Sequence, residues 1–306
     1  NMKSLYSMFL SQAYQDCWDD YNRSVKLKNF PRWDYVILTA SNDQQAEGFR
    51  RQIEERKEYL PAGTRFAAIP DRGGERVGSG GATLEVLKYL HEQEGDFRKL
   101  RVLVIHSGGD SKRVPQYSAL GKLFSPVPHQ LPDGRSSTLF DEFMICMSSM
   151  PSRIREGMVL LSGDVLLLFN PLQIDYNNVG AAAISFKERV KVGKNHGVYV
   201  NGEDGNVKCC LQKKPEEELR EAGAVNEAGC VDIDTGALIF STAMMDSLYS
   251  LIGTEEGYDR YVNGTVRLSL YADFLYPLAE DSTLEQFYLE KPEGEFCEEL
   301  TGAREQ

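Results

Sequence analysis

The chain lacks the usual marks of a membrane, secreted or nucleic-acid-binding protein. No apolar run approaches the roughly 18–20 residues that a membrane helix needs, and no signal peptide is visible. The six cysteines include no CxxC pair, which favours reduced, buried thiols in a cytoplasmic protein. Lys and Arg number 34 against 46 Asp and Glu, so the net charge is −12. This acidity argues against nucleic-acid binding, which depends on cations that neutralise phosphates. Any phosphate site must therefore be a local basic pocket.

The common nucleotide-binding motifs are also missing or incomplete. The run from Gly78 to Thr83 resembles the dinucleotide fingerprint, but Thr83 stands where the third glycine belongs. A P-loop needs glycine five residues before Gly121, and Gln116 occupies that position. The glycine loop of small-metabolite kinases and the protein-kinase motif set are absent. We therefore expect neither a dehydrogenase nor a kinase of these types.

What is present indicates a globular α/β protein. Of the 306 residues, 42% are hydrophobic and 26% are charged, which is an ordinary soluble composition. Apolar runs alternate with helical patterns in the first third of the chain, and this order predicts a parallel sheet. We expect strands at 34–40, 65–70, 101–106, 157–164, 181–186, 197–200, 207–212 and 231–240, and helices at 3–29, 41–57, 82–91, 136–150, 215–221 and 243–251. One continuous domain over 1–306 is the expected organisation.

The most specific stretch follows the strand expected at 101–106. A glycine pair, Gly108 and Gly109, comes directly after it, and Arg113 and Lys122 follow. Glycines let backbone N–H groups approach an anion closely, and cations neutralise a polyphosphate at the carboxyl end of a strand. Open α/β sheets bind ligands at that end. The stretch therefore predicts a nucleotide-handling enzyme.

A later apolar strand ends in Asp164, and this order fits nucleotidyl transfer to a sugar phosphate. The nucleophile is then already an anion, so catalysis needs positioning and charge neutralisation rather than a base. The planar guanidinium of Arg113 suits the leaving pyrophosphate, and Lys122 suits the phosphate being transferred. Asp164 is a hard oxygen ligand for Mg²⁺, and Asp234 is a candidate second ligand. A strand-ending aspartate alone often only caps the next element.

These segments together resemble the fucose-1-phosphate guanylyltransferase family, including the nucleotidyltransferase half of bifunctional fucokinase/guanylyltransferases. The likeness covers most of residues 75–300 and depends on the order of several uncommon strings. They are Val77-Gly-Ser-Gly-Gly-Ala-Thr, Ile105-His-Ser-Gly-Gly-Asp-Ser-Lys-Arg-Val-Pro, Gly121-Lys-Leu-Phe-Ser-Pro-Val-Pro, Ser162-Gly-Asp, His196-Gly-Val, Leu211-Gln-Lys-Lys-Pro and Asp234-Thr-Gly.

The resemblance implies a Rossmann-like nucleotidyltransferase fold with a mostly parallel mixed sheet flanked by helices. It implies GTP and L-fucose-1-phosphate as substrates, GDP-L-fucose as product and Mg²⁺ as cofactor. The nucleotide-binding half is expected at about 30–170 and the sugar-phosphate-binding half at about 171–306. The residues implied are Gly78, Ser79, Gly80, Gly81, Gly108 and Gly109 for the nucleotide, Arg113 and Lys122 for its phosphates, Asp164 and Asp234 for the metal, and Lys214, Lys213, His196 and Gly197 for the sugar phosphate.

Several alternatives stay open at this point. The chain has two adjacent lysines where the family usually shows one, so Lys213 competes with Lys214. No kinase half is present, so fucokinase activity is not inferred, although longer relatives carry such a fusion. The chain stops before the β-helical region of many members and is either a short member or a fragment. Another sugar-1-phosphate, UTP in place of GTP, or a non-catalytic nucleotide-sugar-binding role are the competing functions. His106 is either a structural hydrogen-bond partner or a ligand contact.

Overall fold

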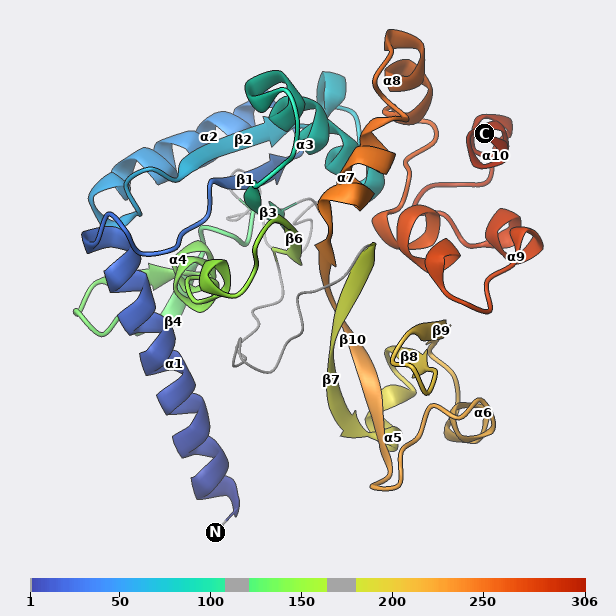
Figure 1. The fold of residues 1–306 in the computed structure, drawn as a ribbon, viewed down its shortest axis with the longest axis horizontal. Helices are drawn as coiled ribbons and strands as arrows, with labels where there is room; N and C mark the ends of the chain where they lie inside the picture. Colours follow the sequence, from blue (N-terminus) through green and yellow to red (C-terminus); the bar gives the residue numbers. More distant parts are fainter. Residues whose placement is uncertain (1, 108–120, 164–179) are drawn as a thin grey trace. The chain divides into compact units, whose positions relative to one another are not determined.

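The computed structural model describes residues 2–107, 121–163 and 180–306 (Figure 1). The chain divides into two compact units whose segments interleave along the sequence. Unit 1 comprises residues 1–74, 89–180 and 240–246, and unit 2 comprises residues 75–88, 181–239 and 247–306. The expected division of one domain into a nucleotide-binding half and a sugar-phosphate-binding half stays a prediction.

Four parallel strands form the sheet of unit 1, in the order β2-β1-β3-β6. These are β1 (Tyr35–Ala40), β2 (Arg65–Pro70), β3 (Arg101–His106) and β6 (Gly157–Ser162). Their apolar runs are buried in β1, β3 and β6, as expected for a parallel sheet covered on both faces. His106 pairs with Thr39 on one side and Ser162 on the other, so these strands end at one edge. Ligands bind at that edge in open α/β sheets.

Short local signals begin the helices of unit 1. The Asn42 side chain accepts a hydrogen bond from the Gln45 backbone N–H at 2.9 Å and caps α2 (Asp43–Glu55), which lies along β1 and β2 (Figure 1). A capping box between Thr138 and Asp141 begins α4 (Leu139–Cys146). The remaining elements of this unit are α1 (Met2–Lys26), the hairpin β4 (Pro126–Gln130) and β5 (Ser136–Thr138), and parts of α3 (Gly78–Glu94) and α7 (Thr242–Tyr249).

Unit 2 has its own strands, which pair in the order β10-β8-β9, with β7 beside β10 (Figure 1). These are β7 (Ala181–Arg189), β8 (Gly197–Asn201), β9 (Val207–Gln212) and β10 (Cys230–Phe240), and the pairs formed by β8 are antiparallel. One face of these strands is apolar: Val198 and Ile233 pack against Leu219 of α6 (Glu216–Glu221) and Val190 of α5 (Val190–Gly193). Strand alternation places polar side chains on the opposite face, among them Tyr199, Gln212 and Asp232.

The C-terminal segments of unit 2 form short helices joined by a buried ion pair. These are α8 (Glu255–Tyr261), a π-helical turn (Leu270–Leu275), α9 (Leu284–Leu289) and α10 (Glu298–Glu305). The Arg304 guanidinium meets the Asp273 carboxylate at 2.8 Å, and both side chains are almost fully buried. Arg304 also donates to the carbonyl oxygens of Tyr288 and Glu290, at 3.3 and 2.8 Å. The last helix is therefore fixed to the preceding segments by one arginine.

The expected α/β class and parallel sheet are confirmed, and most strand positions agree. Two expectations are wrong in detail. The helix expected at 82–91 begins at Gly78, and residues 136–138 are strand β5 rather than the start of a helix. Residues 136–138 pair with β4 in a short hairpin, and the start of α3 packs against residues 267–270, which are distant in sequence. No helix in the described ranges is long and apolar enough to cross a membrane.

Candidate functional site

Four of the predicted site residues lie outside the described residues: Gly108, Gly109, Arg113 and Asp164. Lys122 lies in unit 1, directly after Gly121, and its side chain is exposed. Gly121 has φ +66°, a conformation that favours glycine, and its backbone approaches the Gln45 side-chain amide of α2. Lys122 therefore follows a sharp turn that a glycine stabilises.

The glycine-rich start of α3 packs against backbone within unit 2. The Gly80 N–H donates to the Leu268 carbonyl oxygen at 2.7 Å. A Cβ at Gly80 would lie 2.8 Å from that oxygen, and one at Gly78, where φ is +80°, would overlap it. Close backbone packing thus accounts for both glycines. Their predicted contact with the nucleotide is not tested by this geometry and stays a prediction.

Ser79 carries the polar contacts at the same helix start. Its backbone N–H donates to Glu293 Oε2 at 3.0 Å, and its hydroxyl also bonds the Glu293 carboxylate. The Leu270 N–H donates to Ser79 Oγ at 2.9 Å. A carboxylate therefore occupies the helix N-terminus, where the helix dipole favours negative charge.

The residues predicted for the sugar phosphate gather on neighbouring strands of unit 2. Gly197 opens β8 and pairs with Gln212 of β9, and a Cβ at Gly197 would lie 3.4 Å from the Asp234 Cβ of β10. The His196 carbonyl oxygen accepts from the Lys213 N–H at 3.1 Å, while the His196 side chain is exposed. Positions separated by up to 38 residues in sequence thus become neighbours through strand register.

Lys213 and Lys214 differ in their surroundings. Lys213 has φ +50°, so it turns the chain at the end of β9. Lys214 lines a cavity of about 600 Å³ and lies 3.7 Å from the Glu218 carboxylate. This volume is in the range of small-molecule sites. Lys214 therefore lines a ligand-sized cavity, and Lys213 does not.

Asp234 is the one predicted metal ligand within the described residues. Its Oδ1 accepts from the Gly236 N–H at 2.7 Å, and its carboxylate also interacts with the Tyr199 hydroxyl. The nearby Asp232 is engaged by Lys187 at 2.9 Å and by the Asn201 side-chain amide at 2.8 Å. Among the described residues no group of three or more His, Cys, Asp or Glu side chains could hold a metal ion. A magnesium site here depends on Asp164 and stays a prediction.

The polar face of β8 and β9 also carries groups that sequence reasoning missed. Tyr199 is 4% exposed, and its hydroxyl has no hydrogen-bond partner of normal geometry among the described residues. Burial, followed by the charges of Asp234 and Cys210, raises the pKa of Tyr199 well above its usual value. Gln212 Nε2 donates to the Tyr276 hydroxyl at 2.8 Å. Period-two alternation in β8 and β9 is the sequence signal for Tyr199 and Gln212, and Tyr276 lies outside both strands.

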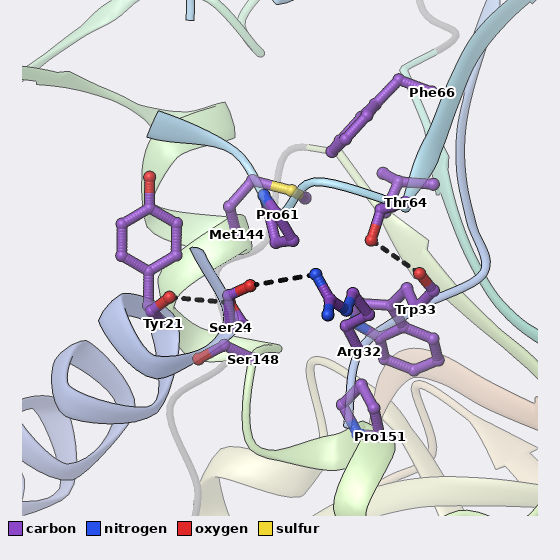
Figure 2. Close-up of a pocket in the computed structure, with 11 residues that line it drawn as sticks. Tyr21, Ser24, Arg32, Trp33, Pro61, Thr64, Phe66, Met144, Ser148 and Pro151 are labelled. Atoms are coloured by element: carbon purple, nitrogen blue, oxygen red, sulfur yellow. Dashed lines mark hydrogen bonds between the residues drawn. The ribbon is translucent and has the colours of Figure 1, made fainter. Parts of the chain in front are cut away.

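A second cavity, in unit 1, is a packing void (Figure 2). Its volume is about 20 Å³, which is room for about one water molecule. The polar groups around it are used locally: Thr64 Oγ1 donates to the Trp33 carbonyl oxygen at 2.6 Å, and Arg32 donates to the carbonyl of Ser24 at 3.5 Å. This cavity does not form a substrate site.

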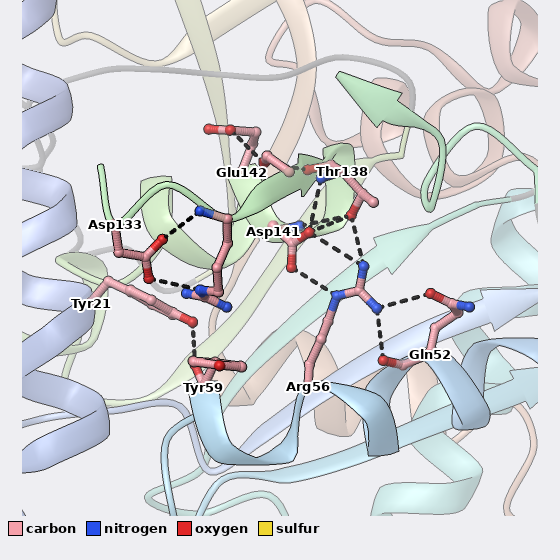
Figure 3. Close-up of polar contacts among 10 residues, drawn as sticks. Tyr21, Gln52, Arg56, Tyr59, Asp133, Thr138, Asp141 and Glu142 are labelled. Carbon is pink, nitrogen blue, oxygen red and sulfur yellow. Dashed lines mark hydrogen bonds and ion pairs between the residues drawn. The ribbon is translucent and has the colours of Figure 1, made fainter. Parts of the chain in front are cut away.

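A polar cluster in unit 1 also has a structural role (Figure 3). Arg56 donates to Asp141 Oδ1 at 2.8 Å and to the Gln52 side chain at 2.9 Å, and its guanidinium lies over the Phe124 ring. Both ionic side chains are largely buried. Because its donors are occupied, Arg56 is a link between α2 and α4 rather than a phosphate ligand.

The fold and the polar face of unit 2 define an α/β protein with a polar, ligand-sized cavity. Comparison with known families is more specific. Residues 95–306 match the fucose pyrophosphorylase domain, and the chain belongs to that family.

Similar proteins of known name agree with this family assignment. The chain is 34% identical over 182 residues to a mouse fucose-1-phosphate guanylyltransferase, covering 57% of this chain and 30% of the relative. It is 27% identical over 291 residues to the human fucose-1-phosphate guanylyltransferase, covering 83% of this chain and 46% of the relative. Identity to the Arabidopsis thaliana bifunctional fucokinase/GDP-fucose pyrophosphorylase is 29% over 267 residues, covering 75% of this chain and 25% of the relative. The matched part therefore spans between a quarter and just under half of these relatives.

Proposed function

We propose that this chain transfers a guanylyl group from GTP to L-fucose-1-phosphate and releases pyrophosphate. The proposal is supported by the family match over residues 95–306 and by the similarity to the mouse and human fucose-1-phosphate guanylyltransferases. The product is then GDP-L-fucose.

One observation carries the proposal: three predicted site residues lie on or next to neighbouring strands. Gly197 begins β8, Asp234 lies in β10 and Lys214 follows the end of β9. Lys214 lines the large cavity of unit 2, where an ammonium group can hold a phosphate. The other lining groups are mixed polar and apolar side chains, which suit a sugar better than a purely apolar ligand.

The reaction proposed needs no side-chain base. A phosphate oxygen of the sugar-1-phosphate attacks the α-phosphorus of GTP, forming a new P–O bond. The bond between the α-phosphorus and the bridging oxygen breaks, and pyrophosphate leaves with its electron pair. Arg113 and Lys122 are proposed to neutralise the phosphates, which is the main contribution that cations make to such transfers. Mg²⁺, proposed to be held by Asp164 and Asp234, would supply further charge neutralisation.

A coupled pyrophosphate assay tests the function directly. GTP, UTP, CTP, dTTP and ATP are each combined with several sugar-1-phosphates, with and without a chelator. We expect the fastest release with GTP and L-fucose-1-phosphate, and loss of release when Mg²⁺ is chelated. A clear preference for another nucleotide or another sugar would overturn the specificity, and no release with any pair would overturn the activity.

We also propose a cytoplasmic setting and a link to a sugar kinase. All six cysteines are free thiols, which suits a reducing compartment. Two relatives, from Arabidopsis thaliana and Bacteroides fragilis, are named as bifunctional with a fucokinase. A kinase that phosphorylates the sugar at its first carbon would supply the second substrate.

A further inference from the structure

The large cavity of unit 2 has walls suited to a polyol that carries one anionic group. Lys208 and Lys214 contribute ammonium groups, Asp281 and Glu290 contribute carboxylates that can accept from sugar hydroxyl groups, and the neutral hydrogen-bonding groups come from Tyr276, Ser282 and Gln286. A sugar ring offers several hydroxyl groups, so a site that selects one sugar needs fixed donors or acceptors that each meet one hydroxyl.

Tyr276 is a wall group whose side chain is held by a hydrogen bond. Its hydroxyl oxygen accepts from Gln212 Nε2 at 2.8 Å, so the O–H remains able to donate. The nearby Cys210 thiol is at most a weak acceptor for that proton. A sugar oxygen at the cavity wall would be a stronger one.

Gly197 explains how Gln212 reaches this position. A Cβ at Gly197 would lie 2.9 Å from Gln212 Nε2 and 3.2 Å from Gln212 Oε1, closer than such contacts normally are. The glycine of the His196-Gly197 string therefore leaves room for the Gln212 amide, which in turn holds Tyr276. This gives the glycine a role that its conformation alone does not require.

Tyr199 lies on the same face of the strands. It pairs with Cys210 across β8 and β9, is almost fully buried, and its hydroxyl has no partner of normal geometry among the described residues. The Asp234 carboxylate interacts with this hydroxyl, so Tyr199 and Asp234 form a polar pair beneath the strands. Tyr276 and Asp234 are close enough to influence its pKa.

From this geometry we infer that Tyr276, positioned by Gln212, donates a hydrogen bond to one hydroxyl group of the sugar. This contact helps to determine which sugar-1-phosphate is accepted. The inference rests on the proposed function, because it assigns the sugar substrate of that reaction to the cavity. Tyr276 is a specificity residue, and Gln212 is a positioning residue that acts through it.

Steady-state kinetics of Tyr276→Phe test the inference. Loss of one hydroxyl hydrogen bond worth about 1 kcal/mol should raise KM for the sugar-1-phosphate about fivefold, with KM for GTP unchanged. The variant should also discriminate less between sugar-1-phosphates that differ at a single hydroxyl. Gln212→Leu should give a similar but smaller change, because Tyr276 stays but loses its fixed orientation.

Tyr288→Phe is the matched control. Tyr288 is 40% exposed on α9 and does not line the cavity, so both KM values should match the parent. If the parent protein is active and Tyr276→Phe keeps its sugar KM and its discrimination, the inference is wrong while the proposed function stands. If the parent releases no pyrophosphate with any sugar-1-phosphate, the proposed function fails first. Circular dichroism and thermal unfolding verify that each variant is folded.

Discussion

At the scale of single residues, His106 shows how burial decides the role of a titratable group. It ends β3, and its Nδ1 lies 3.1 Å from the Thr39 hydroxyl of β1. Burial lowers the pKa of His106 to about 4, because the charged imidazolium is poorly solvated there. Of the two roles that the sequence leaves open, the structural hydrogen bond is present.

This burial predicts a pH dependence of stability. The unfolded chain takes up the His106 proton near pH 6.5 and the folded chain only near pH 4. Between these values the unfolded state binds more protons, so the free energy of unfolding falls as the pH drops from about 6.5 toward 4. The loss from this group is at most on the order of 3 kcal/mol.

Urea unfolding of the parent and of His106→Gln at several pH values measures this effect. We expect the free energy of unfolding of His106→Gln to fall less between pH 6.5 and 4 than that of the parent. His91→Gln is the control, because it also removes a histidine from unit 1. The His91 ring packs edge-on against Phe97 near the end of α3. Equal slopes for the parent and His106→Gln would mean that His106 is not buried as a neutral ring.

Residue roles were only partly predictable from the sequence, and Tyr276 shows why. Gly197 and Lys214 could be singled out because they belong to short strings. The pair formed by Gln212 and Tyr276 joins positions 64 residues apart through a side-chain contact that no local pattern encodes. Tyr199 is likewise one tyrosine among 15 until the register of β8 and β9 is known.

At the scale of elements, the first strands and helices were predictable because their signals are local. β1 and β3 are short apolar runs, and Asn42 lies directly before α2. The hairpin of β4 and β5 was not expected, because its strands are short and mostly polar and depend on pairing with each other. The elements after residue 253 are short helices, and such short segments give only weak local patterns.

The start of α3 yields a prediction at this scale. Gly78→Ala should destabilise the protein by about 3 kcal/mol or more, because the new methyl group overlaps the Leu268 carbonyl and the residue must hold φ +80°. Gly73→Ala, at φ +65° with open space around it, should cost only about 1–2 kcal/mol. Denaturant unfolding with GTP absent separates packing from ligand binding. Equal losses in the two variants would contradict the packing explanation.

At the scale of the whole molecule, the acidic chain must concentrate positive charge where phosphates bind. With a net charge of −12, the overall field repels the two proposed substrates, GTP and a sugar phosphate, so we expect the binding of each to depend on nearby cations. Arg113 is predicted to hold the nucleotide phosphates, and Lys214 the sugar phosphate. The two contacts should therefore be separable by mutation.

Thermal unfolding with each ligand tests this separation without requiring turnover. A ligand that binds only the folded protein stabilises it by about 2.7 kcal/mol at a hundred times its Kd, and Tm rises accordingly. Arg113→Ala should lose most of the rise given by GTP and keep that given by the sugar-1-phosphate, and Lys214→Gln should do the reverse. Lys191 is an exposed lysine on α5, and Lys191→Gln is the control for the loss of one positive charge. If Lys214→Gln abolishes the GTP effect as strongly as the sugar-phosphate effect, the two phosphates share one cation cluster and the separate assignments are wrong.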